Sequence, residues 1–235
     1  MSLDSSKRKP QQKPIPPEGQ HLGLLYAIVD LGTQMESFKG QPAKEVPKIH
    51  FSWEFPRLKA IFNPEKGPQC LGAFQEYSYS LGAKANFGKM INSWLKKDKQ
   101  IEALSYDTLT KILGRPCIIP IEHKSNKDYP EIKYANIAGN GVAVYKRPED
   151  VKFPAETSNE KLIFALDHFS WEVFNKIPRF LQEKIEHSLE WPKVLKEHGP
   201  NPANSQSGVV AASGVIETDE EEFNTGASVI EEDPF

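Results

Sequence analysis

Lysine and aromatic side chains are interleaved along several segments of this 235-residue sequence. Lysine ammonium groups neutralise phosphates, and flat aromatic rings stack on unpaired bases whatever the identity of the base. A surface that combines the two is suited to single-stranded nucleic acid. The residues that could form such a surface are Lys39, Lys44, Lys48, Trp53, Tyr77, Tyr79, Lys84, Lys89, Lys124, Lys127, Tyr129, Lys133 and Tyr134.

Other aromatic residues have the spacing of core residues, because each lies on an apolar strand face or on a helix stripe. We assign this group to the core: Phe51, Phe55, Phe74, Phe87 and Trp94. Four of the candidate contact residues fit either role, since they also lie on alternating segments. These four are Trp53, Tyr77, Tyr79 and Tyr134.

The segment Val29-Asp30-Leu31-Gly32-Thr33 follows an apolar run and could support a second kind of chemistry. It is similar to the first phosphate motif of actin-like and heat-shock ATPases, in which backbone N–H groups meet a phosphate. Asp30 could instead hold a metal, as in ribonuclease-H-like nucleases, but two-metal chemistry needs further carboxylates at neighbouring strand ends. The other expected strands do not end in carboxylates. We therefore expect Gly32 to make the turn after the first strand, with Asp30 capping it locally.

No other motif points to catalysis. The sequence contains neither a GxxxxGK[ST] phosphate loop nor a GxSxG nucleophile motif, and its six histidines are scattered. Cys70 and Cys117 lack the spacing of a metal site or a disulfide framework, which favours a reducing, cytoplasmic compartment. We predict a protein without enzyme activity, cofactor or metal.

The chain ends in the acidic and aromatic segment Glu231-Glu232-Asp233-Pro234-Phe235. A terminal Phe places an apolar ring and an α-carboxylate at one point, and a pocket with an apolar floor and a basic rim could capture both. The preceding acids would steer the approach to that rim. We therefore predict that Glu231, Glu232, Asp233, Pro234 and Phe235 form a partner-binding tip.

Charge divides the sequence into four regions. Residues 21–147 hold 18 basic and 12 acidic residues, whereas residues 201–235 hold eight acidic residues and no Lys or Arg. Residues 1–20 carry a charge of +2 and residues 148–200 a charge of −3. The two terminal regions have too little apolar content to fold, so we expect a disordered basic, Pro-rich arm and a disordered acidic tail. A basic body with an acidic end favours a polyanion-binding domain.

Hydrophobic alternation between the two tails predicts five strands. They are Leu22–Leu31, Lys48–Phe55, Gln75–Leu81, Pro116–Lys124 and Glu131–Ala138. Pro56 is expected to end the second strand. Apolar residues at helical spacing, from Phe87 to Leu95 and from Tyr106 to Leu113, predict helices between the third and fourth strands, the second of them capped by Gly114.

This order predicts a mainly β domain over residues 21–147, a five-stranded OB-fold barrel with a helix between strands three and four. A plain antiparallel sheet with one helix would give the same order, but closure of a barrel removes exposed edges. In an OB fold, the loops after the first and fourth strands flank the ligand groove. Lys39 and Lys44 lie in the first of these loops, and Lys127 and Tyr129 lie in the second.

Residues 157–197 have helical spacing, beginning with Leu162 and Phe164. Pro178 and Pro192 fit helix starts, where a missing N–H costs little. We expect residues 148–200 to form a helical extension that either packs on the barrel or forms a contact surface. No apolar run approaches the ~20 residues of a membrane-spanning helix, so we predict no membrane association.

The tip resembles the acidic tail with terminal Pro-Phe of bacterial single-stranded DNA-binding proteins, although only Glu-Glu-Asp precedes Pro-Phe here. The body resembles the single-stranded DNA-binding proteins of tailed bacteriophages. The pieces that carry this second resemblance are Ala27–Gln34 (AIVDLGTQ), Gly40-Gln41, Lys48–Pro56 (KIHFSWEFP), Leu113–Cys117 (LGRPC) and Ile177–Trp191 (IPRFLQEKIEHSLEW). The resemblance implies that the Asp-Leu-Gly-Thr-Gln segment belongs to the first strand of an OB barrel.

The expected function is coating of single-stranded DNA in phage replication and recombination, in the host cytoplasm. The tip would recruit replication or recombination proteins such as a polymerase, helicase or recombinase. The body is longer than its bacterial counterpart, so a homo-oligomer is left open and a tetramer is not implied. Three alternatives stand beside this function: an RNA-binding OB module, a metal-dependent nuclease using Asp30, and an adaptor whose region 157–197 docks a partner.

Overall fold

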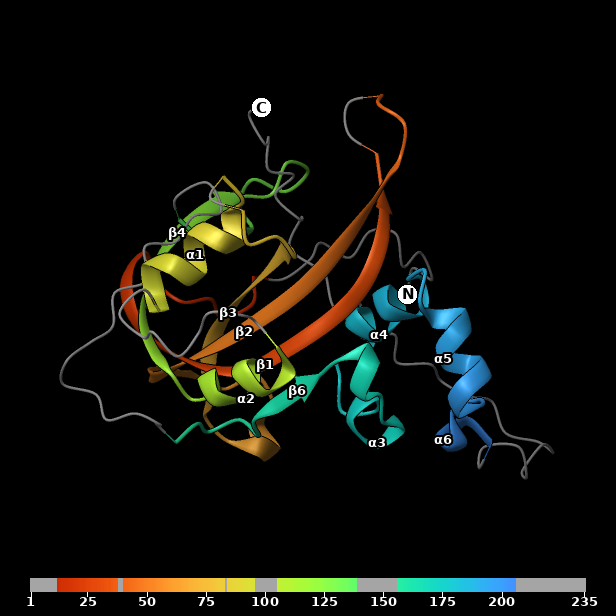
Figure 1. Cartoon of the computed structure of the whole chain (residues 1–235). Coiled ribbons are helices and arrows are strands. Elements are labelled where there is room, and N and C mark those ends of the chain that lie inside the picture. Colours follow the sequence, from red (N-terminus) through yellow and green to blue (C-terminus); the bar gives the residue numbers. More distant parts are fainter. Residues whose placement is uncertain (1–11, 38–39, 83, 96–104, 139–155, 206–235) are drawn as a thin grey trace, which may run out of the picture.

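The computed structural model describes residues 12–37, 40–82, 84–95, 105–138 and 156–205 (Figure 1). Its strands are β1 (Gly19–Glu36), β2 (Lys44–Ala60), β3 (Gln69–Ser78), β4 (Pro116–Ser125), β5 (Lys133–Ile137) and β6 (Leu162–Phe164). Its helices are η2 (Pro64–Lys66), α1 (Asn86–Leu95), α2 (Tyr106–Ile112), η3 (Leu166–His168), α3 (Trp171–Phe174), α4 (Arg179–Glu186), α5 (Trp191–His198) and α6 (Pro202–Ser205). Lys39 and the tip Glu231–Phe235 lie outside the described residues.

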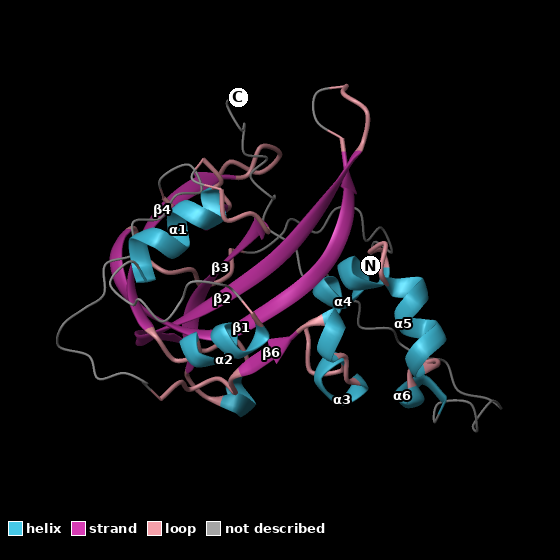
Figure 2. Ribbon diagram, viewed as in Figure 1, coloured by secondary structure: helices cyan, strands magenta, loops and turns pink. Residues whose placement is uncertain are grey.

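The strands form one curled, open sheet in the order β3-β2-β1-β4-β5, with every neighbouring pair antiparallel (Figure 2). The five expected strands are therefore present in the expected order, and α1 and α2 lie between the third and fourth as predicted. β6 adds a short parallel pairing to β1. The fold is a mainly β half-barrel.

β1 pairs with β4, β6 and β2 along different parts of its length. Its first part, Gly19–Leu24, pairs with β4, and Ala27–Val29 pairs with β6. β2 pairs with β1 from Leu24 to Glu36, with breaks in register between Leu25 and Ala27 and between Asp30 and Gly32. Irregularities of this kind bend a strand and increase its twist, so they account for the curl.

Several strand boundaries differ from the sequence-based expectation. β1 spans Gly19–Glu36 rather than Leu22–Leu31, and β2 begins at Lys44 rather than Lys48. Pro56 does not end β2, which continues to Ala60; Pro56, Arg57 and Leu58 fall in a break of register with β3, where a missing N–H costs no ladder hydrogen bond. β3 spans Gln69–Ser78 rather than Gln75–Leu81. The predicted alternation rests on Tyr77, near the end of β3, and on Tyr79, which follows the strand, whereas pairing with β2 begins at Gln69.

The extension after the sheet also begins differently from the prediction. Leu162 and Phe164 lie in β6, not in a helix. β4 leaves β1 after Leu24, and β6 then occupies the same edge at Ala27–Val29. The expectation for Pro178 and Pro192 is confirmed, because Pro178 precedes α4 and Pro192 is in the first turn of α5.

The apolar residues form two buried clusters. The first fills the concave side of the sheet, where Phe87, Met90 and Trp94 of α1 pack against β2 and β3. The second joins Val29 and Leu31 of β1 to the C-terminal helices. Within the described part of the chain, no helix is long and apolar enough to cross a membrane.

Candidate nucleic-acid interface

Two of the predicted stacking residues are wrong, because they belong to the core. Trp53 is 0% exposed and Tyr77 is 2% exposed. Both side chains lie on the same face of the sheet as Phe51. The ring centroid of Phe51 is 5.7 Å from that of Trp53 and 6.2 Å from that of Tyr77. Strand periodicity therefore places these rings on the concave face, where no base can reach them.

Phe74 shows the opposite error. We assigned it to the core, but it is 49% exposed on the outward face of β3. Its neighbours Leu71, Ala73 and Tyr77 are buried, so its own position is out of phase with them. The ring is stacked on that of His50, with centroids 5.4 Å apart and planes inclined by 24°. The phase of β3 could have revealed this exposed platform if the strand had been placed correctly.

The hairpin of β4 and β5 brings the largest group of predicted contact residues together. Lys124 stands directly opposite Tyr134, and Ser125 stands opposite Lys133. Lys127 and Tyr129 lie in the connecting loop. We call this group the hairpin cluster; its members are Lys124, Lys127, Tyr129, Lys133 and Tyr134.

Asn126 fixes the loop of the hairpin cluster. Its Oδ1 accepts from the backbone N–H of Asp128 at 2.8 Å and of Tyr129 at 3.2 Å. Its Nδ2 donates to the Tyr134 hydroxyl, and its N–H donates to the Ile132 carbonyl at 2.8 Å. The loop that carries Lys127 and Tyr129 is thus held by hydrogen bonds in one shape.

The hairpin presents cations on both of its faces. Ile121 and Ile137 face each other in the core, and strand alternation puts Lys133 on their side and Lys124 on the other. Lys124 pairs with Glu122 at 3.3 Å, with both side chains well exposed, so water screens this pair. Lys127 and Lys133 are exposed and have no ion pair with another described residue.

The N-terminal segment lies against the same hairpin. The Gln12 side chain accepts from the Lys133 N–H at 2.7 Å and donates to the Lys133 carbonyl at 3.1 Å. The His123 N–H donates to Glu18 at 2.9 Å, and the His123 ring lies 2.7 Å from the Pro16 carbonyl oxygen. The Gln12 side chain therefore satisfies the backbone N–H and C=O of Lys133 on the outer edge of β5.

The other predicted cations do not join the hairpin cluster into one surface. Lys48 is tied to Glu36 at 2.8 Å, and Lys44 is exposed at the start of β2. Lys84 and Lys89 are exposed before and on α1. Tyr79 follows β3, with its ring 5.4 Å from Phe87 of α1. The twelve predicted residues that the structure describes therefore fall into separate groups instead of lining one continuous groove.

Asp30 has a structural role. One carboxylate oxygen accepts from the Gly32 N–H at 2.9 Å and the other from the Leu166 N–H at 3.3 Å. Burial raises the pKa of Asp30, against the effect of these two hydrogen bonds. The local cap is thus confirmed, but Gly32 lies in a bulge within β1 and not in a turn after it. Among the described residues, no three His, Cys, Asp or Glu side chains are grouped to hold a metal.

The same segment of β1 docks the C-terminal helices. The Thr33 N–H and hydroxyl donate to the Glu190 carboxylate at 2.8 and 2.6 Å, and Gln34 donates to the Lys184 carbonyl at 2.9 Å. Burial raises the pKa of Glu190, but the hydrogen bonds from Thr33 outweigh it and hold the pKa below its usual value. We call Asp30, Gly32, Thr33 and Gln34 with their partners the β1 seam.

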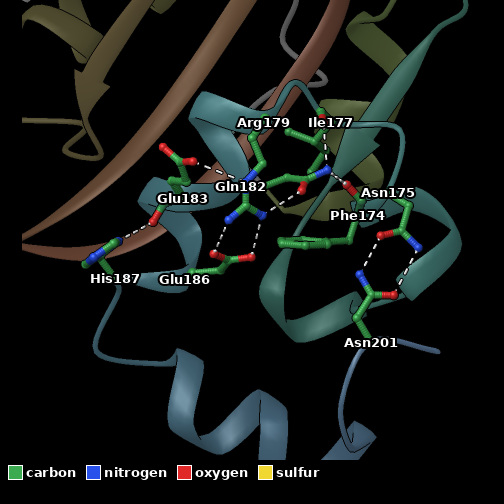
Figure 3. Close-up of polar contacts among 9 residues, drawn as sticks. All are labelled: Phe174, Asn175, Ile177, Arg179, Gln182, Glu183, Glu186, His187 and Asn201. Atoms are coloured by element: carbon green, nitrogen blue, oxygen red, sulfur yellow. Dashed lines mark hydrogen bonds and ion pairs between the residues drawn. The ribbon is translucent and has the colours of Figure 1, made fainter. Parts of the chain in front are cut away.

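Polar contacts within the helices hold the other side of the β1 seam in shape (Figure 3). Arg179 forms a two-pronged pair with Glu186, at 3.0 and 3.2 Å. Gln182 donates to the carbonyls of Phe174 and Ile177, at 3.1 and 2.8 Å. The bond from Gln182 to Phe174 ties α4 to α3, whereas the pair of Arg179 and Glu186 lies within α4.

The helices and the segment before them also cover the outward face of β2. Glu54, 1% exposed, accepts from the N–H groups of Ser158 and Asn159 at 2.6 and 2.8 Å. On β3, Glu76 lies 2.5 Å from the Lys184 ammonium and 3.8 Å from the buried His50 ring. The outward face of β2 is therefore closed at His50, Ser52 and Glu54, while Phe74 and Gly72 leave part of β3 open.

Comparison of the chain with family models, with curated proteins and with solved structures finds no match.

Proposed function

We propose that this protein binds single-stranded DNA and has no enzymatic activity. The observation that carries the proposal is the hairpin cluster, which holds three lysines and two tyrosines on one short, hydrogen-bonded hairpin. The ammonium groups of Lys127 and Lys133, which form no ion pair within the described part of the chain, suit phosphates. The exposed ring of Tyr129 suits an unstacked base. Duplex DNA would not offer free base faces to that ring.

We further propose that the half-barrel is an OB fold. The strand order β3-β2-β1-β4-β5 with α1 and α2 between β3 and β4 supports this, as does the approach of β5 to β3 across the open side of the sheet. OB folds bind oligonucleotides on the face of strands two and three, flanked by the loops after strands one and four. Here that face contributes the exposed Phe74 and the second of those loops contributes Lys127 and Tyr129.

The biological role that we propose is coating of single-stranded DNA in phage replication and recombination, with recruitment of partner proteins through Glu231–Phe235. This part of the proposal is supported by the sequence resemblance of the body and of the tip. An RNA-binding role is the alternative, because contacts to the 2′-OH depend on local geometry.

The direct test is binding to matched fluorescent oligonucleotides as single-stranded DNA, duplex DNA and RNA. We expect single-stranded DNA to bind most tightly and Tyr129→Ala to weaken that binding by roughly 5- to 150-fold, since base stacking is worth ~1–3 kcal/mol. The control is Leu195→Ala, which removes another exposed apolar side chain, from α5.

Equal affinity for single-stranded and duplex DNA would contradict the proposal. Tighter binding of RNA than of DNA would replace it with the RNA-binding alternative. Equal weakening by Tyr129→Ala and Leu195→Ala would show that the hairpin cluster is not the contact surface.

A further inference from the structure

The end of the β2–β3 hairpin exposes a second combination of cations and apolar side chains. We call residues 57–69 the β2–β3 tip, which is separate from the C-terminal tip Glu231–Phe235. Ile61 is 59% exposed and Phe62 is 48% exposed, immediately after β2. Arg57, Lys59 and Lys66 are exposed on the same hairpin. None of the three forms an ion pair with another described residue. The sequence-based selection of contact residues included no residue of this tip.

The packing of β2 shows which way these cations point. Leu58 and Ala60 pack against the core on the concave side. Because side chains alternate along a strand, Arg57 and Lys59 point to the opposite, outward side. Lys59 stands directly opposite Cys70 of β3, whose thiol lies 3.5 Å from the Ser158 hydroxyl.

The turn at the tip has a defined shape. Asn63 caps η2 by accepting from the Glu65 N–H at 2.8 Å, and Pro64 occupies the first helical position. Gly67 then leaves the helix with a φ of 67°, and its N–H donates to the Pro64 carbonyl at 3.4 Å. Phe62 is therefore presented by a capped turn, and Glu65 is the tip's single acidic residue.

The tip is continuous with the open part of β3. Gly72 is exposed and carries no side chain, and an added Cβ would lie 2.5 Å from the Trp53 carbonyl oxygen. Phe74 follows on the same outward side as Gly72. Two exposed rings, Phe62 and Phe74, lie before and after a stretch of β3 in which Gly72 is exposed and Cys70 is half-buried beside Ser158. Arg57 and Lys59 lie at one end of this stretch.

We infer that the β2–β3 tip is a second contact region for single-stranded DNA, which binds phosphates through Arg57, Lys59 and Lys66 and a base through Phe62. This inference rests on the proposed function. The tip and the loop of the hairpin cluster lie at opposite ends of the sheet (Figure 1; η2 tan at the bottom, residues 126–132 green at the top). A strand that touches both regions must cross the sheet, so the tip adds affinity only for oligonucleotides long enough to reach it.

The test compares two triple variants on a long and a short single-stranded oligonucleotide. Arg57→Ala/Lys59→Ala/Lys66→Ala removes the cations of the tip. Lys111→Ala/Lys193→Ala/Lys196→Ala removes the same charge from α2 and α5. On the long oligonucleotide, we expect the tip variant to lower the slope of log affinity against log salt by about 2, at about 0.7 per lost phosphate contact, and the control to leave it unchanged.

The short oligonucleotide separates the inference from the proposed function. If the wild type binds neither oligonucleotide, the proposed function is wrong. If it binds both, and the tip variant keeps the wild-type slope on the long one, the inference is overturned while the function stands. A second readout is photo-crosslinking of halogenated oligonucleotides to the wild type: adducts on the peptide with Phe62 support the inference, and adducts confined to the hairpin cluster overturn it.

Discussion

The β1 seam and the hairpin cluster are both rich in polar groups, but they use them differently. In the β1 seam, each carboxylate meets donors of the same chain: Asp30 meets Gly32 and Leu166, and Glu190 meets Thr33. In the hairpin cluster, Lys127 and Lys133 point to solvent without an ion pair among the described residues.

The difference separates polar groups that fix the fold from polar groups that remain free for a ligand. A buried polar group must be satisfied internally, because leaving it without a partner costs about 1–3 kcal/mol. An exposed lysine has no such requirement, and its charge stays available to a phosphate. Variants in the β1 seam should therefore change stability, and variants in the hairpin cluster should change binding.

The largest effect should come from Gly32→Ala. At Gly32 an added Cβ would lie 2.6 Å from Ser188 Cβ and 2.7 Å from a Glu190 carboxylate oxygen, and φ is 67°. Overpacking and left-handed backbone together predict a loss of about 2–4 kcal/mol in the free energy of unfolding. Urea denaturation followed by tryptophan fluorescence measures this loss.

Gly67→Ala is the matched control for that variant. Gly67 also has a φ of 67°, but nothing lies within 4 Å of its added Cβ. Only the backbone cost should remain, which at a ψ of −164° is about 1–3 kcal/mol. Equal losses for the two variants would mean that the helices do not press on Gly32, and the docking role of the β1 seam would be wrong.

A smaller effect is expected at the contact between Glu76 and Lys184, which also fastens α4 to the sheet. Burial raises the pKa of Glu76, but contact with His50 and Lys184 outweighs it and holds the pKa at about 2. Since this pKa lies below the usual 4.5, the contribution to stability is complete above pH ~4.5 and disappears as the pH falls towards 2. Glu76→Gln should thus cost about 2 kcal/mol at pH 7, after allowance for partial exposure, and almost nothing near pH 2.

Urea denaturation of both proteins from pH 7 to pH 3 checks this dependence. Burial lowers the pKa of His50, against the effect of Glu76. Protonation of His50 should therefore destabilise both proteins in acid, and Glu76→Gln somewhat more, because it lacks the opposing carboxylate. Glu122→Gln, which breaks an exposed pair with Lys124, should cost less than about 0.5 kcal/mol. If the difference in free energy of unfolding between wild type and Glu76→Gln did not change with pH, the assigned contact between Glu76 and Lys184 would be contradicted.

Strand periodicity predicted much of the fold because it reports which residues face the core. It placed Phe51 and Phe55 correctly, and the order of five strands followed from it. It failed for β6, where three residues pair with an edge that β4 has left. This edge of β1 is open to β6 because β1 curls away from β4. The hydrophobic pattern of the sequence does not report that curl.

The candidate site was less predictable, because exposure depends on what covers each strand face. The outward polar residues of β2, such as His50 and Glu54, look solvent-facing in the sequence but are buried under the C-terminal segment. Phe74 on the next strand remains exposed. A two-residue period distinguishes the faces of a sheet, but only the path of the chain from residue 156 onward determines which outward face is open.

The smallest expected effect, and the sharpest contrast with the β1 seam, is that of Lys127→Ala. Removal of one phosphate contact should lower the slope of log affinity against log salt by about 0.7. The free energy of unfolding should change by less than about 0.5 kcal/mol, since the side chain is exposed. Lys193→Ala on α5, where Lys193 pairs with Glu197 at 3.8 Å, should leave both quantities unchanged. If Lys127→Ala instead lowered stability and kept the wild-type slope, the hairpin cluster would be structural, like the β1 seam.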